Sequence, residues 1–231
     1  MPLQCKMKKG EAIPQLNRKR ENGDIPKSLK EIYQECGSEI FDRLDEFRSL
    51  LERGDEESLF AEMVFCIFTP QSNARSCWEA VERLCSKNLL LKGDAPLVAR
   101  HLKGVRFHHT KARRAVQARK RFSLFLLQLR KTTHAQDLRQ WLVKNIPGLG
   151  YKEASHFLRN IGFGEDLAIL DRHIMRNLRE FGIIPVIPSS ISRKTYLEME
   201  EKMKRWAEQI HIPLSHLDLV LWFREKKEIF K

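Results

Sequence analysis

Residues 145–177 read NIPGLGYKEASHFLRNIGFGEDLAILDRHIMRN, and this stretch decides the fold. It opens with a turn in which Gly148 and Gly150 bracket a leucine. Glycines let a tight turn approach another object closely, and the amides at the start of the next helix favour an anion. The stretch therefore predicts a phosphate-binding hairpin between two helices, although an ordinary helix–helix turn also often contains glycine.

A lysine and an acid follow this hairpin. Lys152 stands in the first turn of its helix, where the helix dipole disfavours a charged ammonium. A neutral amine is a nucleophile that can form a Schiff base, whereas a charged lysine would simply bind phosphate beside the hairpin. Asp171 is placed to cap the helix that runs to about Phe181. Because a capping carboxylate keeps one oxygen available, the spacing permits Lys152 and Asp171 to face one cleft.

The composition indicates a polyanionic partner. The 231 residues include 42 lysines and arginines against 30 acids, a formal net charge of +12. Nucleic acid is the first candidate for such a surplus, and a basic but unrelated protein is the alternative. No apolar run approaches about 20 residues, so we expect no membrane-spanning helix. The first residues, MPLQCKMKKGEA, lack the apolar segment of a secretory signal.

Five scattered cysteines form no CxxC pair and end at Cys85. An odd number of cysteines without a secretory signal favours a reducing compartment, so we expect an intracellular protein. The basic charge adds the expectation that this protein is associated with DNA. Zinc and iron–sulfur ligand spacings are absent. Cys66 and Cys77 lie in apolar runs and are predicted to be core residues.

Helical periodicity dominates the chain. Residues 1–27 are basic with little apolar periodicity, which predicts a flexible tail, and residues 28–231 predict one domain of about ten helices. Only residues 183–187 are ambiguous with a strand, so the fold class is all-α. We expect the first helix to be interrupted near Gly37 and residues 125–129 to form a helix of their own.

Two further segments allow more than one interpretation. The helix that contains residues 111–121 carries six lysines and arginines, which suits either a phosphate-facing surface or a solvated helix face. Ser215 and Asp218 have the spacing of a capping box at the start of the last helix. That interpretation explains Asp218 without a role in the site.

Together, the hairpin, the lysine and the aspartate resemble the helix-hairpin-helix DNA glycosylase superfamily. The signature here reads IPGLGYKEASHFLRNIGF followed by AILDRHI. The lysine at the hairpin resembles the bifunctional members, which also have AP-lyase activity. FCIFTPQSNARSCWEAV at 65–81 and the C-terminal LDLVLWFREKKEIFK are similar to the second, archaeal-type class of 8-oxoguanine DNA glycosylases. Cysteines of the endonuclease III iron–sulfur cluster are missing, and Leu170 departs from the usual proline or valine.

This resemblance implies two helical subdomains with the active-site cleft between them. The helix-hairpin-helix motif would span about residues 139–163, and the loop of the catalytic aspartate residues 162–172. A damaged nucleotide would be flipped out of duplex DNA, Lys152 would attack its C1′, and Asp171 would stabilise the charge on the sugar. The Schiff base would then permit β-elimination of the 3′ phosphate. The implied partner is damaged double-stranded DNA bound by a monomer.

The resemblance also implies which residues recognise the base and whether a cofactor is needed. The carboxylate of Lys231 would accept the N1–H and N2–H₂ donors of the guanine, with a frayed chain end as the alternative. Trp222 would stack on the flipped base or belong to the core, and Gln71 would contact the base or cap the following helix. No metal or organic cofactor is implied, although members often hold a structural monovalent cation at the hairpin.

Two other functions remain open at this stage. One is a glycosylase and AP lyase for a different damaged base. The other is a non-catalytic helix-hairpin-helix DNA-binding module, which would have no use for Lys152 together with Asp171.

Overall fold

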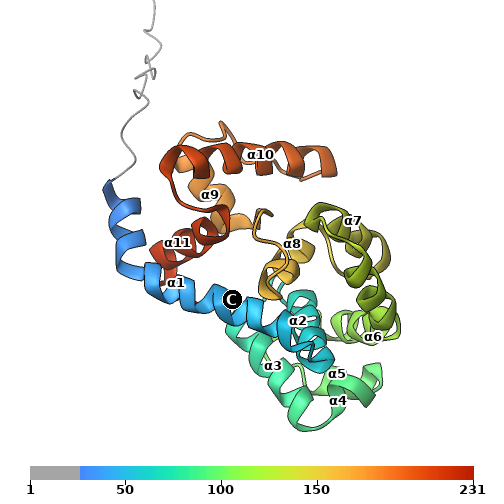
Figure 1. Ribbon diagram of the computed structural model, residues 1–231. Helices are drawn as coiled ribbons and strands as arrows, with labels where there is room; N and C mark the ends of the chain where they lie inside the picture. Colours follow the sequence, from blue (N-terminus) through green and yellow to red (C-terminus); the bar gives the residue numbers. More distant parts are fainter. Residues whose placement is uncertain (1–26) are drawn as a thin grey trace, which may run out of the picture.

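The computed structural model describes residues 27–231, and its regular structure is helical throughout (Figure 1). Its eleven helices are α1 (Lys27–Arg53), α2 (Glu56–Phe68), α3 (Ala74–Ser86), α4 (Leu89–Lys92), α5 (Ala95–Arg100), α6 (His108–Lys131), α7 (Ala135–Asn145), α8 (Tyr151–Asn160), α9 (Arg172–Glu180), α10 (Arg193–Ile210) and α11 (Leu214–Lys226). Over this range the prediction of an all-α fold is confirmed. The predicted tail lies outside the described residues, except that Lys27 already belongs to α1.

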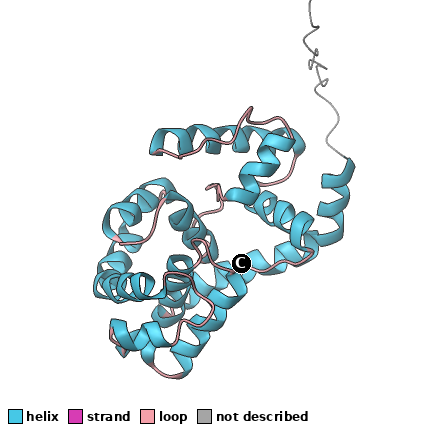
Figure 2. Ribbon diagram, turned by 180° about the vertical axis from the view of Figure 1, so that it is seen from behind, coloured by secondary structure: helices cyan, strands magenta, loops and turns pink. Residues whose placement is uncertain are grey.

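Side-chain caps start several of these helices. Asp55 accepts the Glu57 amide at the start of α2, and Ser192 accepts the Thr195 amide at the start of α10. Such caps satisfy backbone donors that have no partner inside the helix. These polar residues therefore define where the two helices begin. Seen from behind, loops alone connect the helices (Figure 2).

Three boundary predictions are wrong. α1 continues through Gly37, because an apolar stripe that includes Cys36 and Ile40 packs against other helices and offsets the cost of the glycine. Residues 125–129 belong to α6, which stays helical to Lys131. α11 begins at Leu214, with Pro213 before it, so Ser215 and Asp218 are buried inside the helix and form no capping box.

The core consists of two hydrophobic clusters. The first joins α2, α3 and α5–α8 and contains Phe65 and Phe157. The second joins α1 with α9–α11 and contains Met203 and Leu217. These clusters correspond to two helical subdomains. α1 supplies residues to both, with most of its apolar stripe in the second cluster and Leu50 in the first (Figure 1).

A glycine turn fixes α8 against α1. Gly162 has a φ of +73°, and a Cβ there would lie 2.6 Å from the Cα of Arg48. Only glycine fits such a close approach of two backbones with this left-handed conformation. The turn that ends the lysine's helix is thereby held directly against the helix that crosses both subdomains.

Two of the six basic residues of this α6 segment have structural roles. Lys111 is buried, its pKa is lowered by burial, and its ammonium donates to the carbonyls of Phe68 and Pro70 at 2.6 and 2.7 Å. Arg119 donates to three carbonyls of α4 and the residue after it. Neither side chain can face a phosphate, so that interpretation is wrong for both. A phosphate-facing position stays a prediction for the exposed Arg113.

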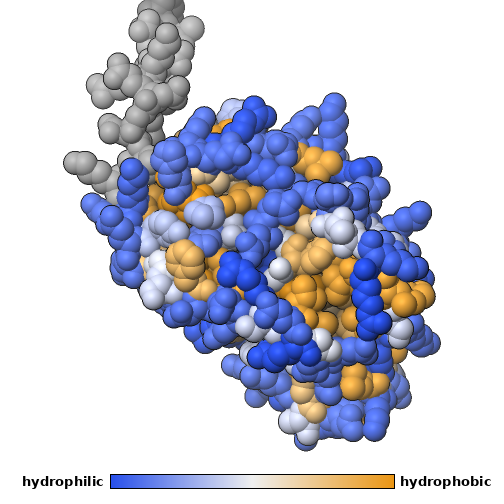
Figure 3. Space-filling view, viewed as in Figure 1, coloured by the Kyte–Doolittle hydropathy of each residue, from blue (hydrophilic) through white to orange (hydrophobic). Residues whose placement is uncertain are grey.

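The surface seen in Figure 3 is hydrophilic over most of its area, and hydrophobic side chains gather between α2, α6 and α7. Along residues 27–231, none of the helices combines the length and the apolar character needed to cross a bilayer.

Candidate active site

A cleft of about 710 Å³ opens between the two subdomains. It is lined by five of the residues singled out in the sequence: Gln71, Lys152, Asp171, Trp222 and Lys231. These residues come from the loop after α2, from α8, from the start of α9, from α11 and from the last position of the chain. The fold therefore brings together side chains that are up to 160 positions apart (231 − 71).

The hairpin connects α7 to α8 as predicted. Gly148 has a φ of +98°, and a Cβ there would meet the Arg114 side chain at 2.7 Å, so the turn requires glycine. Gly150 precedes the first residue of α8, and its amide donates to the Glu153 carboxylate at 3.2 Å. Neither glycine lines the cleft itself. A phosphate that takes the Gly150 amide would have to replace the carboxylate of Glu153.

Lys152 is half-buried at the second position of α8, inside the first turn as predicted. From Ala154 to its end at Asn160 this helix is buried. A side chain on such a fixed helix has a defined position, and Lys152 projects into the cleft from the first subdomain.

Asp171 caps α9 with one oxygen only. Its Oδ1 accepts the amides of His173 and Ile174, both at 2.8 Å. No hydrogen bond to Oδ2 is found within residues 27–231. The cap thus fixes the carboxylate while its second oxygen stays available in the cleft, which confirms the local geometry inferred from the sequence.

A buried network holds the loop before Asp171. Arg139 on α7 makes a bidentate ion pair with Glu200 on α10, at 2.6 and 2.8 Å, and both side chains are almost fully buried. Glu200 also accepts the Ala168 amide at 2.8 Å. The Tyr196 hydroxyl donates to the Ala168 carbonyl at 2.7 Å and accepts the Leu170 amide at 3.3 Å. Leu170 itself is a buried core residue.

The same arginine reaches the helix that carries the lysine. Arg139 donates to the Ser155 hydroxyl of α8 at 3.1 Å and stacks on the Tyr151 ring, with 5.3 Å between guanidinium carbon and ring centroid. The network therefore links the helix of Lys152 to the loop of Asp171 through one buried cation.

Asp218 belongs to the cleft rather than to a helix cap. Its carboxylate lies 3.3 Å from the Arg159 guanidinium, and both side chains line the cleft floor. Burial raises the pKa of Asp218, the charge of Arg159 opposes this shift, and the charge of Asp171 adds to it. Asp171 contributes to this shift because both acids line the same cleft.

Sequence reasoning missed His156. It lies one turn after Lys152 on α8, lines the cleft and is buried. Burial and the charges of Lys152 and Arg159 lower its pKa well below the usual value, so the ring is neutral. Neither ring nitrogen has a hydrogen-bond partner among the described residues. The spacing of four positions from Lys152 was the available signal, because it places both side chains on one helix face.

Gln71 and Trp222 both line the cleft, but their environments differ. Gln71 is exposed, and α3 is capped by Asn73 instead, so the interpretation of Gln71 as the cap is wrong. Trp222 is half-buried, packs edge-on against His173 with ring centroids 5.5 Å apart, and its indole N–H has no partner in the described part of the chain. A free donor on an aromatic ring in the cleft suits contact with a ligand better than a core position.

The end of the chain is packed rather than frayed. The Lys231 side chain is 10% exposed and forms an ion pair with the buried Glu62 of α2. Its ammonium lies 3.5 Å from the centroid of the Trp78 ring.

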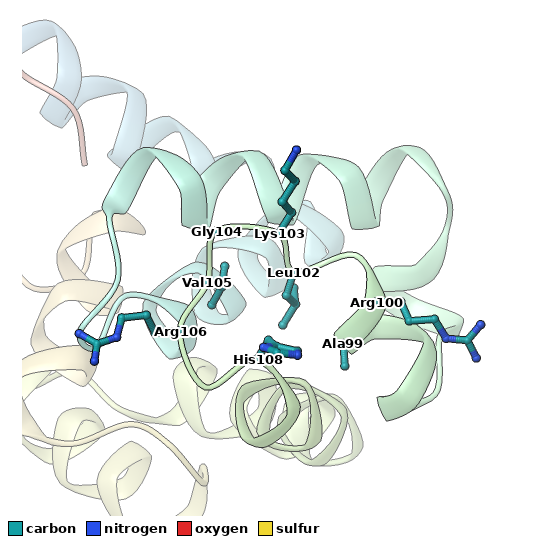
Figure 4. Close-up of a pocket in the computed structure, with 8 residues that line it drawn as sticks. All are labelled: Ala99, Arg100, Leu102, Lys103, Gly104, Val105, Arg106 and His108. Carbon is teal, nitrogen blue, oxygen red and sulfur yellow. The ribbon is translucent and has the colours of Figure 1, made fainter.

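A second hollow lies beside the cleft, in the loop between α5 and α6 (Figure 4). Arg100, Lys103 and Arg106 extend away from it, so its walls offer backbone, apolar groups and the ring of His108. The next residue, Phe107, is 57% exposed with a φ of +57°. The Arg106 amide donates to Ser72, which lines the main cleft, so this exposed aromatic ring stands near the cleft rim. No local sequence signal identified it.

Comparisons with known proteins agree with this geometry. A family model described as 8-oxoguanine DNA glycosylase matches residues 40–212. A relative from Fusobacterium nucleatum, named 8-oxoguanine DNA glycosylase/AP lyase, is 41% identical over 208 residues, covering 88% of this chain and 96% of that protein.

Two solved structures are similar over most of the chain. The 8-oxoguanine DNA glycosylase of Thermotoga maritima matches with a TM-score of 0.82 and 36% identity, covering 89% of this chain and 97% of its own. The Methanocaldococcus jannaschii 8-oxoguanine glycosylase/lyase, in complex with a 15mer DNA that contains 8-oxoguanine, matches with a TM-score of 0.82 and 34% identity, covering 89% and 98%. By these matches, and with its hairpin, its lysine and the aspartate that caps α9, this chain belongs to the 8-oxoguanine DNA glycosylase family.

Proposed function

We propose that this protein excises 8-oxoguanine from duplex DNA and nicks the strand at the resulting AP site, with Lys152 as nucleophile and Asp171 as its carboxylate partner. The observation that carries this proposal is the shared cleft. Lys152 projects from one subdomain, while Asp171 is held on the other with one oxygen bound by the helix cap. A non-catalytic DNA-binding module would need the hairpin but not this pair.

The chemistry follows from the two groups. The damaged nucleotide leaves the stack, because its C1′ cannot be reached inside the duplex. The Lys152 amine attacks C1′, the glycosidic bond breaks and the base leaves. Asp171 stabilises the positive charge that develops on the sugar and orients or deprotonates the amine. Opening of the C1′–O4′ bond, with the ring oxygen taking up a proton, then turns the Lys152 adduct into a Schiff base. The Schiff base acidifies the neighbouring C2′ proton, and removal of this proton expels the 3′ phosphate.

The remaining cleft residues suit recognition of the base. The Lys231 carboxylate is an acceptor for the N1–H and N2–H₂ donors of the guanine ring. Trp222 offers an aromatic face and a free N–H, and Gln71 offers an exposed amide at the rim. The neutral His156 is buried beside them and can donate or accept a hydrogen bond.

The hairpin is proposed to hold a backbone phosphate through the amides near Gly148 and Gly150. A monovalent cation fits the carbonyl side of the same turn. The carbonyls of Asn145 and Ile146 already accept hydrogen bonds from Arg121 and Leu149, whereas those of Gly148 and Leu149 accept none within residues 27–231. The carbonyls of Gly148 and Leu149 would hold such a cation, which would supply positive charge for a backbone phosphate at the hairpin. A monomeric, intracellular state stays a prediction.

Borohydride trapping tests the proposed chemistry. The wild-type protein, mixed with a duplex that carries 8-oxoguanine opposite cytosine, is expected to give a covalent protein–DNA band. Lys152→Gln should abolish the band while DNA binding persists, and Lys144→Gln, at an exposed lysine of α7, should leave it unchanged. A band of undiminished intensity with Lys152→Gln would reject the nucleophile.

Asp171→Asn is the companion variant. Asparagine still caps a helix, so the fold of α9 should persist. Excision should slow by about a hundredfold or more, because the charge facing the sugar is lost. A set of duplexes with other damaged bases in place of 8-oxoguanine separates this activity from a glycosylase of different specificity.

A further inference from the structure

The last residue of the chain is anchored by its side chain. The Lys231 ammonium pairs with Glu62 and lies over the Trp78 ring, 3.5 Å from its centroid, with the Phe65 ring centroid 5.7 Å away. A cation over an aromatic face is attracted by the ring quadrupole, more strongly where water is excluded. Chain ends are usually poorly ordered, so contacts to both α2 and α3 set this end apart.

Glu62 is a buried acid among the apolar residues of α2. It is 4% exposed on α2, whose buried neighbours include Met63 and Phe65. One carboxylate oxygen pairs with Lys231, and the other accepts the Asn160 side-chain amide at 2.9 Å. A buried ion pair adds little net stability compared with apolar side chains of similar size, so stability alone does not account for an acid at this position.

The anchor is tied to the helix of the nucleophile. Asn160 is fully buried at the end of α8, the helix that begins beside Lys152. Glu62 therefore positions the end of the chain relative to α8 as well as to α2. Because Lys231 also lines the cleft, its two charged ends serve different purposes. The ammonium points into the anchor, whereas the backbone end of Lys231 lies near the ring of His156, which lines the cleft.

We infer that Glu62 is a positioning residue for base recognition: it holds the Lys231 ammonium so that the terminal carboxylate meets the flipped base. This inference rests on the proposed function, in which that carboxylate reads the guanine donors. Glu62 touches neither the substrate nor Lys152 in this arrangement. It acts on selectivity through the last residue alone, and the chemistry at C1′ does not depend on it.

Measuring base selectivity and AP-site cleavage separately distinguishes a positioning role of Glu62 from a purely structural one. Glu62→Gln keeps the size of the side chain and an oxygen for Asn160 but removes the charge that holds Lys231. Single-turnover excision should lose between about tenfold and about a hundredfold of its preference for 8-oxoguanine over guanine, as expected for a displaced contact. Cleavage at a preformed AP site has no base to read and should keep the wild-type rate. Glu57→Gln, at an exposed acid of α2, is the matched control.

A chain extended by one glycine after Lys231 tests the carboxylate independently, since it turns that group into an amide and leaves the ammonium in place. Loss of selectivity in both proteins supports the anchor. Loss in the extended chain alone rejects the role of Glu62 and leaves the proposed base reading intact. If selectivity is unchanged in both proteins, the chain end does not recognise the base, and the proposed role of Glu62 is rejected as well.

Lys231→Met breaks the same pair from the other side and serves if Glu62→Gln does not fold. It should reproduce the loss of selectivity, and wild-type selectivity would overturn the inference. In the double variant Glu62→Gln with Lys231→Met, the loss should be no greater than in the more affected single variant, because both changes remove one contact.

Discussion

The Arg139–Glu200 pair and the Glu62–Lys231 pair are both buried, but their surroundings differ. Arg139 and Glu200 lie in the interior and bind α7, α8, α10 and the loop before Asp171 together. Lys231 lines the cleft and is the last residue of the chain. The interior pair thus fixes the helix of Lys152 and the loop of Asp171 relative to each other, whereas the pair at the cleft fixes a group that would contact substrate.

The comparison predicts that breaking the interior pair has the largest effect on stability. Arg139→Ala leaves the Glu200 charge buried without its partner, which typically costs about 3–5 kcal/mol of unfolding free energy. Urea denaturation followed by circular dichroism measures this loss. A loss below about 1 kcal/mol would show that the interior pair does not hold the subdomains together.

Breaking the cleft pair should cost less. In Lys231→Met the new side chain can still pack on Trp78, and Asn160 still donates to Glu62. We expect a loss of about 1–3 kcal/mol in the same denaturation experiment. A loss equal to that of Arg139→Ala would erase the distinction between the two pairs.

A milder change in the interior network should affect rate more than stability. Tyr196→Phe removes the hydroxyl that bonds to Ala168 and Leu170, at a cost of about 1 kcal/mol. Because this loop leads directly into Asp171, single-turnover excision should slow while DNA affinity stays unchanged. Tyr33→Phe, which removes a hydroxyl bonded to His216 away from this loop, is the control and should keep the wild-type rate.

The smallest expected effect is a pH dependence that originates from His156. Burial, aided by Lys152 and Arg159, lowers its pKa below the usual 6.5. The unfolded chain therefore takes up a proton as the pH falls through 6.5 while the folded protein does not, so stability decreases over that range. His156→Gln should lose less stability than the wild type between pH 7.5 and pH 5.5. Equal losses would mean that the ring is charged in the folded protein.

The hairpin, Lys152 and the Asp171 cap could be predicted from the sequence because their signals are local. Gly148 requires its left-handed conformation, and a polar residue before a helix caps it wherever it lies in the fold. The family was predicted from the same residues, and the family model confirms it.

The supporting contacts could not be predicted, because their partners are remote in sequence. Arg139 and Glu200 are 61 positions apart, and Glu62 and Lys231 are 169 apart. Lys111 illustrates the same limit. Charge density alone suggested a phosphate, whereas packing turned this lysine inward to bind the carbonyls that shape the cleft rim.

The uninterrupted course of α1 has a mechanical consequence. This 27-residue helix contributes to both hydrophobic clusters, and the Gly162 turn lies directly on its backbone. Any hinge motion that spread the subdomains would have to bend a continuous helix and open that backbone contact. We therefore expect the two subdomains to move little relative to each other, so that most of the deformation needed to bring a damaged base into the cleft falls on the DNA. Lesions that weaken stacking or pairing would reduce that work, which gives a rigid enzyme a means of selection before any contact with the base.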